Sequence, residues 1–251
     1  MPIDWKIGCS GFHYADWKEI FYPIGLPQKK WFDYYCTQFN TLELNTTFYR
    51  FPQLRFLQNW YDKSPGGFEF SVKAPRLITH YKQFSDTQRL LDDFYGTTRE
   101  GLKDKLGCIL FQLPARLAYS QEMLDRIIAQ LDTSFVNMVE FRHESWWNRE
   151  VMDKLAMSKI GFCGHSYPLL PDEVVCTLPQ AYYRFHGLPR LYYSQYKRAF
   201  VEEVFNSVSA CAQVSKAYIY FNNTATIAAI RNAKYMQALI KKTIPVTRDG
   251  L

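Results

Sequence analysis

The chain has 251 residues, of which 47% are hydrophobic and 17% aromatic, and it carries a formal net charge of +6. This composition excludes an intrinsically disordered protein and allows either one large α/β domain or two small ones. The many Tyr and Phe residues mildly favour a recessed ligand site, because large rings often line pockets.

The Lys and Arg residues are scattered and form no basic block. The positive charge therefore favours a small anionic ligand, with nucleic acid as an alternative partner. No stretch reaches the roughly 18 apolar residues of a membrane-spanning helix, and the first residues lack the features of a signal peptide. We therefore expect a cytoplasmic protein with no membrane association. The sequence indicates no particular oligomeric state.

The six cysteines are far apart and include no C-x-x-C pair. A chain of this length does not need disulfides to hold its core together. We expect all six to be reduced and most of them to be buried.

Alternating apolar and polar residues predict eight strands, which are, in chain order, Trp5–Cys9, Thr41–Asn45, Phe68–Lys73, Cys108–Leu113, Met138–Arg142, Lys159–Cys163, Ala181–His186 and Ala217–Phe221. Helical spacing of apolar side chains predicts the intervening helices Pro27–Phe39, Pro52–Lys63, Gln88–Tyr95, Arg99–Leu106, Gln121–Leu131, Asn148–Ser158, Ser194–Val214 and Ala225–Lys242. Strands that alternate with helices call for a parallel sheet with right-handed crossovers. About eight repeats favour a closed TIM-type (β/α)8 barrel, not necessarily regular, over an open sheet. We predict one barrel domain over residues 1–242 and a loose C-terminal tail over 243–251.

If the apolar strand positions face the helices, the polar positions face the barrel interior. Six strands place polar residues there near their C-terminal ends, namely Glu43, Asn45, Lys73, Gln112, Glu140, Arg142, Arg184, His186 and Asn222. Barrel interiors are usually filled by branched aliphatic residues, and active sites of this fold lie at the C-terminal strand ends. The pattern therefore predicts a functional pocket. The alternative is a network of charges that only neutralise one another.

The charged members of this set suggest roles in catalysis and binding. Glu43 and Glu140 are the candidate general acid and base, because the interior can raise the pKa of one carboxyl while a nearby cation keeps the other ionised. Arg142 and Arg184 suit a carboxylate or phosphate. Lys73 could hold an anion, neutralise a glutamate, or act as an amine nucleophile if its pKa is lowered.

Histidine, tryptophan and asparagine side chains complete the candidate site. His186 could transfer protons near neutral pH. His143 lies on the opposite side of its strand and is expected to anchor the following loop, although it stays a candidate for substrate binding. Six aromatic side chains could stack on a sugar or base above the barrel mouth, namely Tyr14, Trp17, Tyr49, Trp146, Trp147 and Tyr193, with ordinary packing beneath loops as the favoured alternative for Trp17 and Trp147. Asn222 and Asn223 could orient a ligand or cap the next helix.

A divalent metal is conceivable but not favoured. Glu43, Glu140, His80 and His186 have suitable donor atoms, yet no close ligand motif exists and the basic neighbours oppose a cation. No glycine-rich nucleotide motif appears, so no nucleotide cofactor is expected.

Seven segments together resemble the YecE-like family, domain of unknown function 72. They are Ile7–Gly11, Asn40–Tyr49, Val72–Arg76 with Ile78–His80, Phe111–Pro114, Val139–Trp146, Arg184–Gly187 and Tyr220–Asn223. The resemblance spans nearly the whole chain in the family's order, and it implies a TIM-type barrel but no reaction. The family's recurrent polar positions match the nine interior residues named above together with His80, His143 and Asn223. Gly164–Ser166, after the predicted sixth strand, lacks the acidic residue expected from the family.

Three functions are compatible with these residues. The first is an enzyme, such as a hydrolase or lyase, that uses carboxylate acid and base chemistry on a small phosphorylated, sugar or nucleotide-like anion at the C-terminal mouth of the barrel. The second is a metal-assisted phosphodiesterase or nucleic-acid-binding protein. The third is a non-catalytic binding or scaffold protein, whose barrel mouth would be sealed by side chains.

Overall fold

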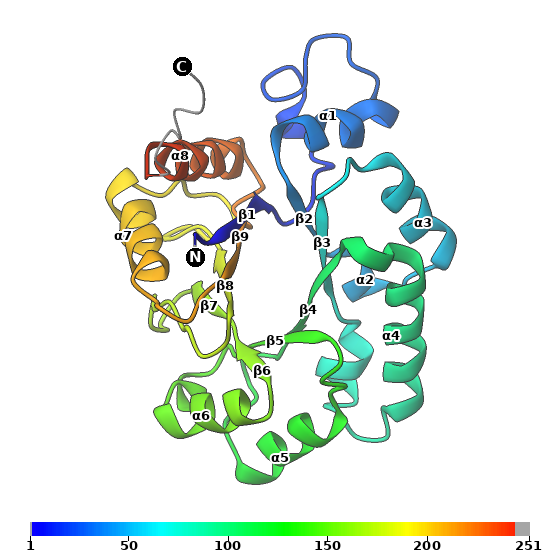
Figure 1. The fold of residues 1–251 in the computed structure, drawn as a ribbon, viewed down its shortest axis with the longest axis vertical. Coiled ribbons are helices and arrows are strands. Elements are labelled where there is room, and N and C mark those ends of the chain that lie inside the picture. The colour runs from blue at the N-terminus through cyan, green and yellow to red at the C-terminus, as the bar shows by residue number, and fades with distance from the viewer. Residues whose placement is uncertain (1, 244–251) are drawn as a thin grey trace, which may run out of the picture.

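Parallel strands and helices alternate along the chain in the computed structural model, which describes residues 2–243. Figure 1 shows the strands around the middle of the molecule and the helices outside them. The strands are β1 Asp4–Cys9, β2 Thr41–Leu44, β3 Glu69–Lys73, β4 Leu106–Gln112, β5 Val136–Glu140, β6 Ile160–Phe162, β7 Gly164–Ser166, β8 Gln180–Phe185 and β9 Lys216–Phe221. The α-helices are α1 Trp31–Gln38, α2 Thr46–Tyr49, α3 Leu54–Lys63, α4 Gln88–Leu102, α5 Gln121–Gln130, α6 Arg149–Met157, α7 Arg198–Ser209 and α8 Ala228–Thr243. The predicted α/β class with parallel strands is confirmed.

The sixth strand position differs from its prediction. β6 is followed after one residue by β7, so Gly164–Ser166 is also strand, although the predicted sixth strand ends at Cys163. The backbone N–H of Cys163, between the two, donates to the carbonyl of Val139 on β5 at 2.9 Å. β6 thus pairs with β5 and β7 pairs with β8, and together they fill one position in the barrel wall.

Two other local differences concern helices. The predicted helices Gln88–Tyr95 and Arg99–Leu106 form the single helix α4, which runs through Gly96 without a break. The short helix α2 and a π-helical turn at Leu77–Tyr81 were not predicted, because four or five residues are too few to display a helical period. Both follow strands that contribute to the candidate site.

Side chains close the barrel between β1 and β2. Only the bridge from Ser10 to Glu43 pairs these two segments directly. The hydroxyl of Tyr35 on α1 accepts the N–H of Cys9 at 2.7 Å and donates to the carbonyl of Thr41 at 3.0 Å. It therefore satisfies two backbone groups that a regular strand ladder would otherwise pair.

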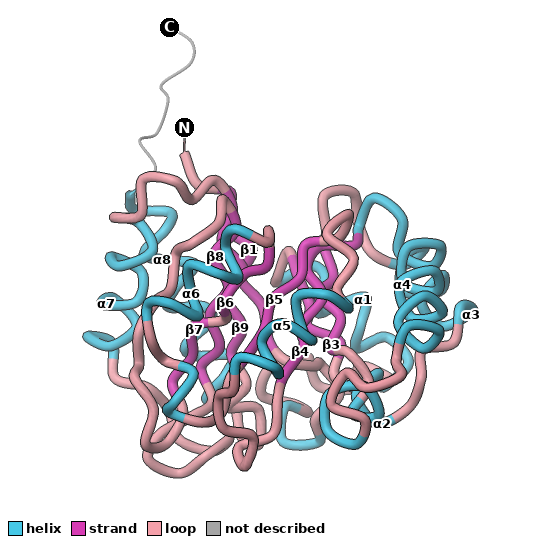
Figure 2. The backbone as a smooth tube through the Cα atoms, turned by 90° about the horizontal axis from the view of Figure 1, so that it is seen from below, coloured by secondary structure: helices cyan, strands magenta, loops and turns pink. Residues whose placement is uncertain are grey.

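Side chains also fill the lower part of the barrel interior. Cys108, Leu110, Met138, Tyr182 and Tyr220 pack there as one buried cluster with further strand residues. The apolar outward positions of the strands are covered by helices, as the alternation predicts. The polar positions near the C-terminal strand ends consequently lie above a closed floor. Figure 2 shows α2 towards the end of the barrel that is away from the N-terminus.

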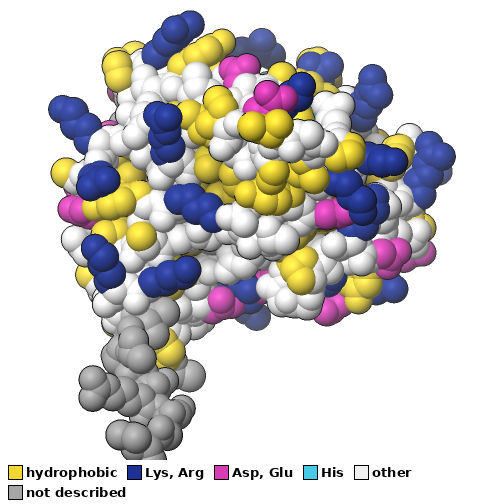
Figure 3. Space-filling view, turned by 90° about the horizontal axis from the view of Figure 1, so that it is seen from above, with side chains coloured by type: hydrophobic (Ala, Val, Ile, Leu, Met, Phe, Trp, Pro, Cys, Tyr) yellow, Lys and Arg dark blue, Asp and Glu magenta, His cyan; other side chains and the backbone are white. Residues whose placement is uncertain are grey.

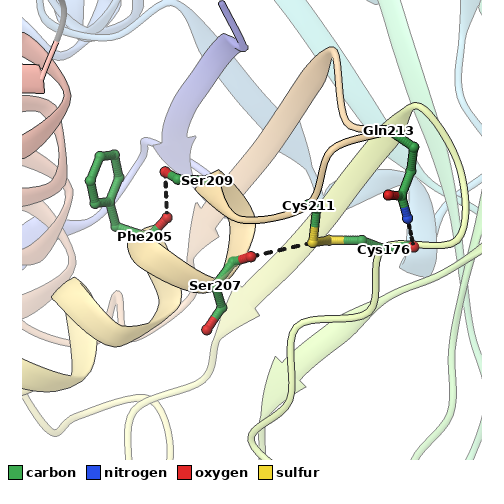
Figure 4. Close-up of a disulfide and its surroundings, with 6 residues drawn as sticks. All are labelled: Cys176, Phe205, Ser207, Ser209, Cys211 and Gln213. Atoms are coloured by element: carbon green, nitrogen blue, oxygen red, sulfur yellow. Dashed lines mark hydrogen bonds between the residues drawn. A yellow bond between two sulfur atoms is a disulfide. The ribbon is translucent and has the colours of Figure 1, made fainter.

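The expectation for the cysteines was wrong for two of them. Cys176 and Cys211 form a disulfide (Figure 4), while the other four are free. The two residues are 35 positions apart, one after β7 and the other after α7, and only the folded barrel brings them together. Spacing along the chain therefore could not reveal the pair.

Between residues 2 and 243, no helix combines the length and apolar character needed to cross a bilayer. Helix α8 ends at Thr243, and the rest of the predicted tail lies outside the described residues. The division into a barrel domain and a tail stays a prediction.

Candidate active site

A pocket of about 490 Å³ opens at the C-terminal ends of the barrel strands. It is lined by Tyr14, Asn45, Phe48, Tyr49, Lys73, Arg76, His80, Tyr81, Gln112, Arg142, Arg184, Tyr192 and Asn222. The strand positions among these follow the inward parity that the sequence predicted. The third hypothesis required a sealed mouth, and the open pocket counts against it.

Glu43 and Arg184 form the central ion pair beneath the pocket. Arg184 Nε donates to Glu43 Oε1 at 2.8 Å, and its Nη2 donates to Oε2 at 2.7 Å. The hydroxyl of Tyr182 donates to Oε1 at 2.8 Å, and the amide of Asn45 donates to Oε2 at 3.1 Å. The fully buried carboxylate of Glu43 is thus held by four donors.

Glu140 joins this pair to a second arginine. Arg184 Nη1 donates to Glu140 Oε2 at 2.6 Å, and Arg142 Nε donates to Oε1. Arg142 also donates through Nη2 to His186 Nε2 at 3.1 Å, and its guanidinium lies over the Tyr167 ring at 3.9 Å. Two carboxylates and two guanidinium groups therefore alternate in one buried network.

We expected the pKa of one of the two glutamates to be raised, and the structure shows neither pKa raised. Burial alone would raise the pKa of Glu43, but the charge and hydrogen bonds of Arg184 outweigh it and leave the pKa below its usual value. The pKa of Glu140 lies well below its usual value, because Arg142 and Arg184 outweigh the same effect of burial. Both carboxyls are therefore ionised near neutral pH, and neither has a proton to donate there. The prediction that burial would raise the pKa of one of them was wrong.

The pKa values of the histidines also differ from the expectation. Burial, followed by the positive charge of Arg142, lowers the pKa of His186 well below its usual value. His186 therefore stays neutral and does not titrate near pH 7, contrary to the predicted proton transfer. Burial and the charge of Lys73 lower the pKa of His80 to about 4, so this pocket residue is also uncharged near pH 7.

Lys73, the last residue of β3, differs from the other charged groups of the site. Its Nζ donates to Gln112 Oε1 at 2.9 Å and lies over the Phe48 ring, 4.0 Å from the centroid. Within residues 2–243 it forms no ion pair. Burial, and then the nearby charge of Arg184, lower its pKa to about 7. The lowered pKa, on which a role of Lys73 as an amine nucleophile depended, is therefore present.

Three predicted binding residues lie away from the pocket. His143 accepts the N–H of Ser145 and caps a short 3-10 helix at Glu144–Trp146. Trp146 is fully buried, stacks on Phe141 and donates to the carbonyl of Leu117. Asn223 is also buried, and its amide donates to the Ser194 carbonyl and to Asn232. We assign structural roles to all three, because none of them lines the pocket and each forms a hydrogen bond within the fold.

Sequence reasoning missed four residues that line the pocket, namely Phe48, Arg76, Tyr81 and Tyr192. All four lie beyond the strand ends, where strand parity no longer says which way a side chain points. Arg76 lies beside Tyr49 and Tyr81, with its guanidinium 5.6 Å and 5.4 Å from the two ring centroids. The feature of the sequence that could have indicated Arg76 as a pocket residue was its position in the segment directly after Lys73.

The candidate metal ligands do not come together as a metal site. In the part of the chain that the structure describes, no group of three or more His, Cys, Asp or Glu side chains is arranged to hold a metal ion. Glu43 and Glu140 are separated by the guanidinium of Arg184, which bonds to both. The donor set is therefore occupied by arginine nitrogens.

Fold and site together define a TIM-type barrel with a cationic pocket at its C-terminal mouth. The model of the family described as protein of unknown function DUF72 matches residues 6–249, and the chain belongs to this family. The predicted resemblance is confirmed.

Individual relatives agree with this assignment. A crystal structure of a DUF72 protein from Thermotoga maritima matches with a TM-score of 0.86 and 26% identity, covering 95% of this chain and 99% of that one. The UPF0759 protein YunF of Bacillus subtilis is 25% identical over 93% of this chain and 94% of its own length. The UPF0759 protein YecE of Escherichia coli is 29% identical, but the match covers only 49% of each chain, about half the length of that relative.

Proposed function

We propose that this protein is an enzyme that binds a small organic anion in the mouth pocket and transfers a proton to or from it through Lys73. One observation carries the proposal. Lys73, Arg76, Arg142 and Arg184 line the pocket, while no Asp or Glu of residues 2–243 does. The two carboxylates underneath balance only part of this charge, so a bound anion would complete the neutralisation.

The donors and rings of the pocket favour a particular kind of anion. Guanidinium groups such as those of Arg76 and Arg142 present forked N–H donors that suit a carboxylate or a phosphate. The rings of Tyr49 and Tyr81 are 66% and 64% exposed at the mouth and offer faces for a sugar or a planar group. Asn45 also lines the pocket, and its buried Oδ1 has no hydrogen-bond partner among the described residues. A phosphorylated or carboxylated sugar-like or nucleotide-like molecule fits these features.

Lys73 is the group best suited to proton transfer. A catalytic acid or base is most effective when its pKa lies near the working pH, and the pKa of Lys73 is about 7. Its amine reaches the pocket, whereas Glu43 and Glu140 do not line it. In this proposal the glutamates are positioning residues, because their bonds hold Arg184 and Arg142 in fixed orientations.

Nucleic acid is a weaker candidate ligand. On the face shown in Figure 3, the Lys and Arg side chains are scattered among hydrophobic, acidic and neutral groups. A nucleic-acid groove needs a continuous basic path to follow the phosphate backbone. The enclosed cationic pocket therefore favours a small molecule.

Thermal unfolding in the presence of anions tests the binding step. The panel comprises inorganic phosphate, sulfate, small carboxylates, sugar phosphates and nucleoside monophosphates, each compared with chloride at equal ionic strength. An anion that binds only the folded protein should raise Tm in a saturable manner. The Arg76→Gln variant should weaken the best anion about tenfold, as expected for one lost charge-assisted hydrogen bond of roughly 1.4 kcal/mol.

Arg99→Gln is the matched control for Arg76→Gln. The Arg99 guanidinium also lies near an aromatic ring, 4.1 Å from the Phe135 centroid, but outside the pocket. The proposal fails if no anion in the panel exceeds chloride, or if the two variants weaken binding equally. The anion that stabilises most is then followed by NMR for turnover, which Lys73→Met should abolish while leaving the thermal shift measurable.

A further inference from the structure

The amine of Lys73 differs in its contacts from the other buried lysines. Lys6, Lys73 and Lys105 are the buried lysines of residues 2–243. Lys6 Nζ lies 2.9 Å from Glu69 Oε1, and Lys105 Nζ donates to the Tyr61 and Ser64 carbonyls and to Ser64 Oγ. Among residues 2–243, Lys73 Nζ donates only to Gln112 Oε1. Of the three lysines, Lys73 thus has the fewest polar contacts at its nitrogen, and it is the one that lines an open pocket.

The surroundings of Lys73 favour an amine with a free lone pair. The site is buried, and burial together with the cations Arg184 and Arg142 outweighs the opposite effect of Glu140 and Glu43, so that the pKa of the amine is lowered. Burial and neighbouring cations both disfavour an ammonium ion, which is how lysine nucleophiles are activated. Gln112 holds the nitrogen by a single hydrogen bond and thereby fixes its position, while the aromatic face of Phe48 covers another side.

We propose that Lys73 is an amine nucleophile that condenses with the carbonyl group of a small substrate carrying a carboxylate or phosphate. The inference rests on the proposed function, because the same cationic pocket would hold the anionic group, with Arg76 and Arg142 beside it. It specifies the substrate class as a carbonyl compound and changes the role of Lys73 from proton transfer alone to covalent catalysis.

The step is balanced without an oxidant or reductant. The neutral Nζ attacks the carbonyl carbon, a C–N bond forms as the π bond of the carbonyl breaks, and a proton passes from the nitrogen to the oxygen to give a carbinolamine. The nitrogen lone pair then expels the hydroxyl group, which takes one proton from solvent and leaves as water, and the product is an imine protonated on nitrogen. The protonated imine withdraws electrons from the adjacent carbon, and this assists proton removal or carbon–carbon bond cleavage there. Hydrolysis with one water returns the amine and the product carbonyl.

Reductive trapping tests the proposal. The full-length protein is incubated with pyruvate or with dihydroxyacetone phosphate in the presence of sodium cyanoborohydride, and its intact mass is measured. Condensation followed by hydride addition should increase the mass by that of the probe acid less one oxygen atom. Peptide mapping should place the adduct on Lys73. The labelling rate should be half-maximal near pH 7, following the pKa of about 7, whereas exposed lysines should label mainly at higher pH.

Matched lysine variants test whether the adduct forms at Lys73 and not at another lysine. Lys73→Arg and Lys73→Met should lose the adduct, while Lys105→Arg, which changes another buried lysine, should keep it. Inorganic phosphate should slow the labelling of the native protein by competing for the pocket. Equal labelling of the Lys73→Met variant, or no adduct with either probe, overturns the inference.

Thermal shifts measured with the same two probes separate the two proposals. Stabilisation by a probe without an adduct rejects the covalent role of Lys73 and leaves the anion site standing. Absence of both stabilisation and adduct rejects the anion site as well. An adduct on Lys73 that phosphate does not slow also counts against the inference, because the anionic group would then not be held in the pocket.

Discussion

Replacing Arg184 with methionine tests the charge network beneath the pocket. Methionine keeps an unbranched side chain of similar reach but cannot donate hydrogen bonds. Arg184 is 1% exposed, and it donates twice to Glu43 and once to Glu140. The change therefore leaves two buried carboxylates with fewer partners. Glu43 is affected most, because only Tyr182 and Asn45 still donate to it.

We expect Arg184→Met to lower the free energy of unfolding by about 3 to 5 kcal/mol at pH 7, the usual effect of removing one partner of a buried ion pair. For a chain of this size that corresponds to a fall in Tm of roughly 6 to 20 °C. The surface substitution Arg149→Met is the control. Arg149 pairs with Asp153 but its side chain is 82% exposed, so the loss there should stay below about 1 kcal/mol.

The pH dependence gives an independent check. In the native protein the pKa of both glutamates lies below the reference value of 4.5, so their stabilisation is present above that value and is lost as the pH falls through the folded pKa. In the variant, burial without Arg184 raises the pKa of Glu43, and the penalty fades as protons bind. The stability difference should shrink from pH 7 towards pH 4. A difference below about 1 kcal/mol at pH 7, or one that grows in acid, would refute the reasoning.

Three further predictions concern the amine, the barrel seam and the disulfide. The pKa of Lys73 is about 7 in the folded protein and 10.5 as its reference, so the native protein should become more stable relative to Lys73→Met as the pH rises from 7 to 10.5. Urea unfolding should show a gain of up to about 5 kcal/mol over this range. Parallel stability profiles of the two proteins would contradict the prediction. Tyr35→Phe should cost about 2 to 5 kcal/mol, since two buried backbone groups lose their partner, while Tyr34→Phe should be nearly neutral. Titration of the denatured, unreduced protein should find four thiols, and six would exclude the disulfide. Replacing both Cys176 and Cys211 by serine should lower the free energy of unfolding by about 3 to 4 kcal/mol, because the bond closes a separation of 35 residues.

The barrel was predictable because its signals are local. Alternation in segments such as Thr41–Asn45 and Ala181–His186 specifies both the strand and the side of it that faces inward. That parity alone predicts that Glu43, Lys73 and Arg184 share one site. The break at Cys163 was not visible, because a strand that bends after three residues has no period to detect.

The chemistry of the site was less predictable, because a pKa depends on distances and not on residue type. Glu140 was expected to act as a general acid or base, but Arg142 and Arg184 keep its carboxylate ionised. Lys73 was one of several candidates, and only the geometry shows that it is buried without a counter-ion in the described residues. The pocket residues Arg76 and Tyr81 lie at the two ends of the short π-helical turn after β3, which is too short to display a period that says which way its side chains point.

The bond between Glu43 and Arg184 joins residues 141 positions apart, and this has a consequence for the nascent chain. At roughly 5 to 20 residues per second, the ribosome adds Arg184 about 7 to 28 seconds after Glu43. Throughout that interval, β2 carries a carboxylate that cannot enter a closed interior without losing its hydration uncompensated. The first half of the barrel should therefore stay hydrated and open while it is being made. Closure then waits for β8, which brings Arg184 to Glu43, and for β9, which pairs with both β8 and β1 and so completes the barrel wall.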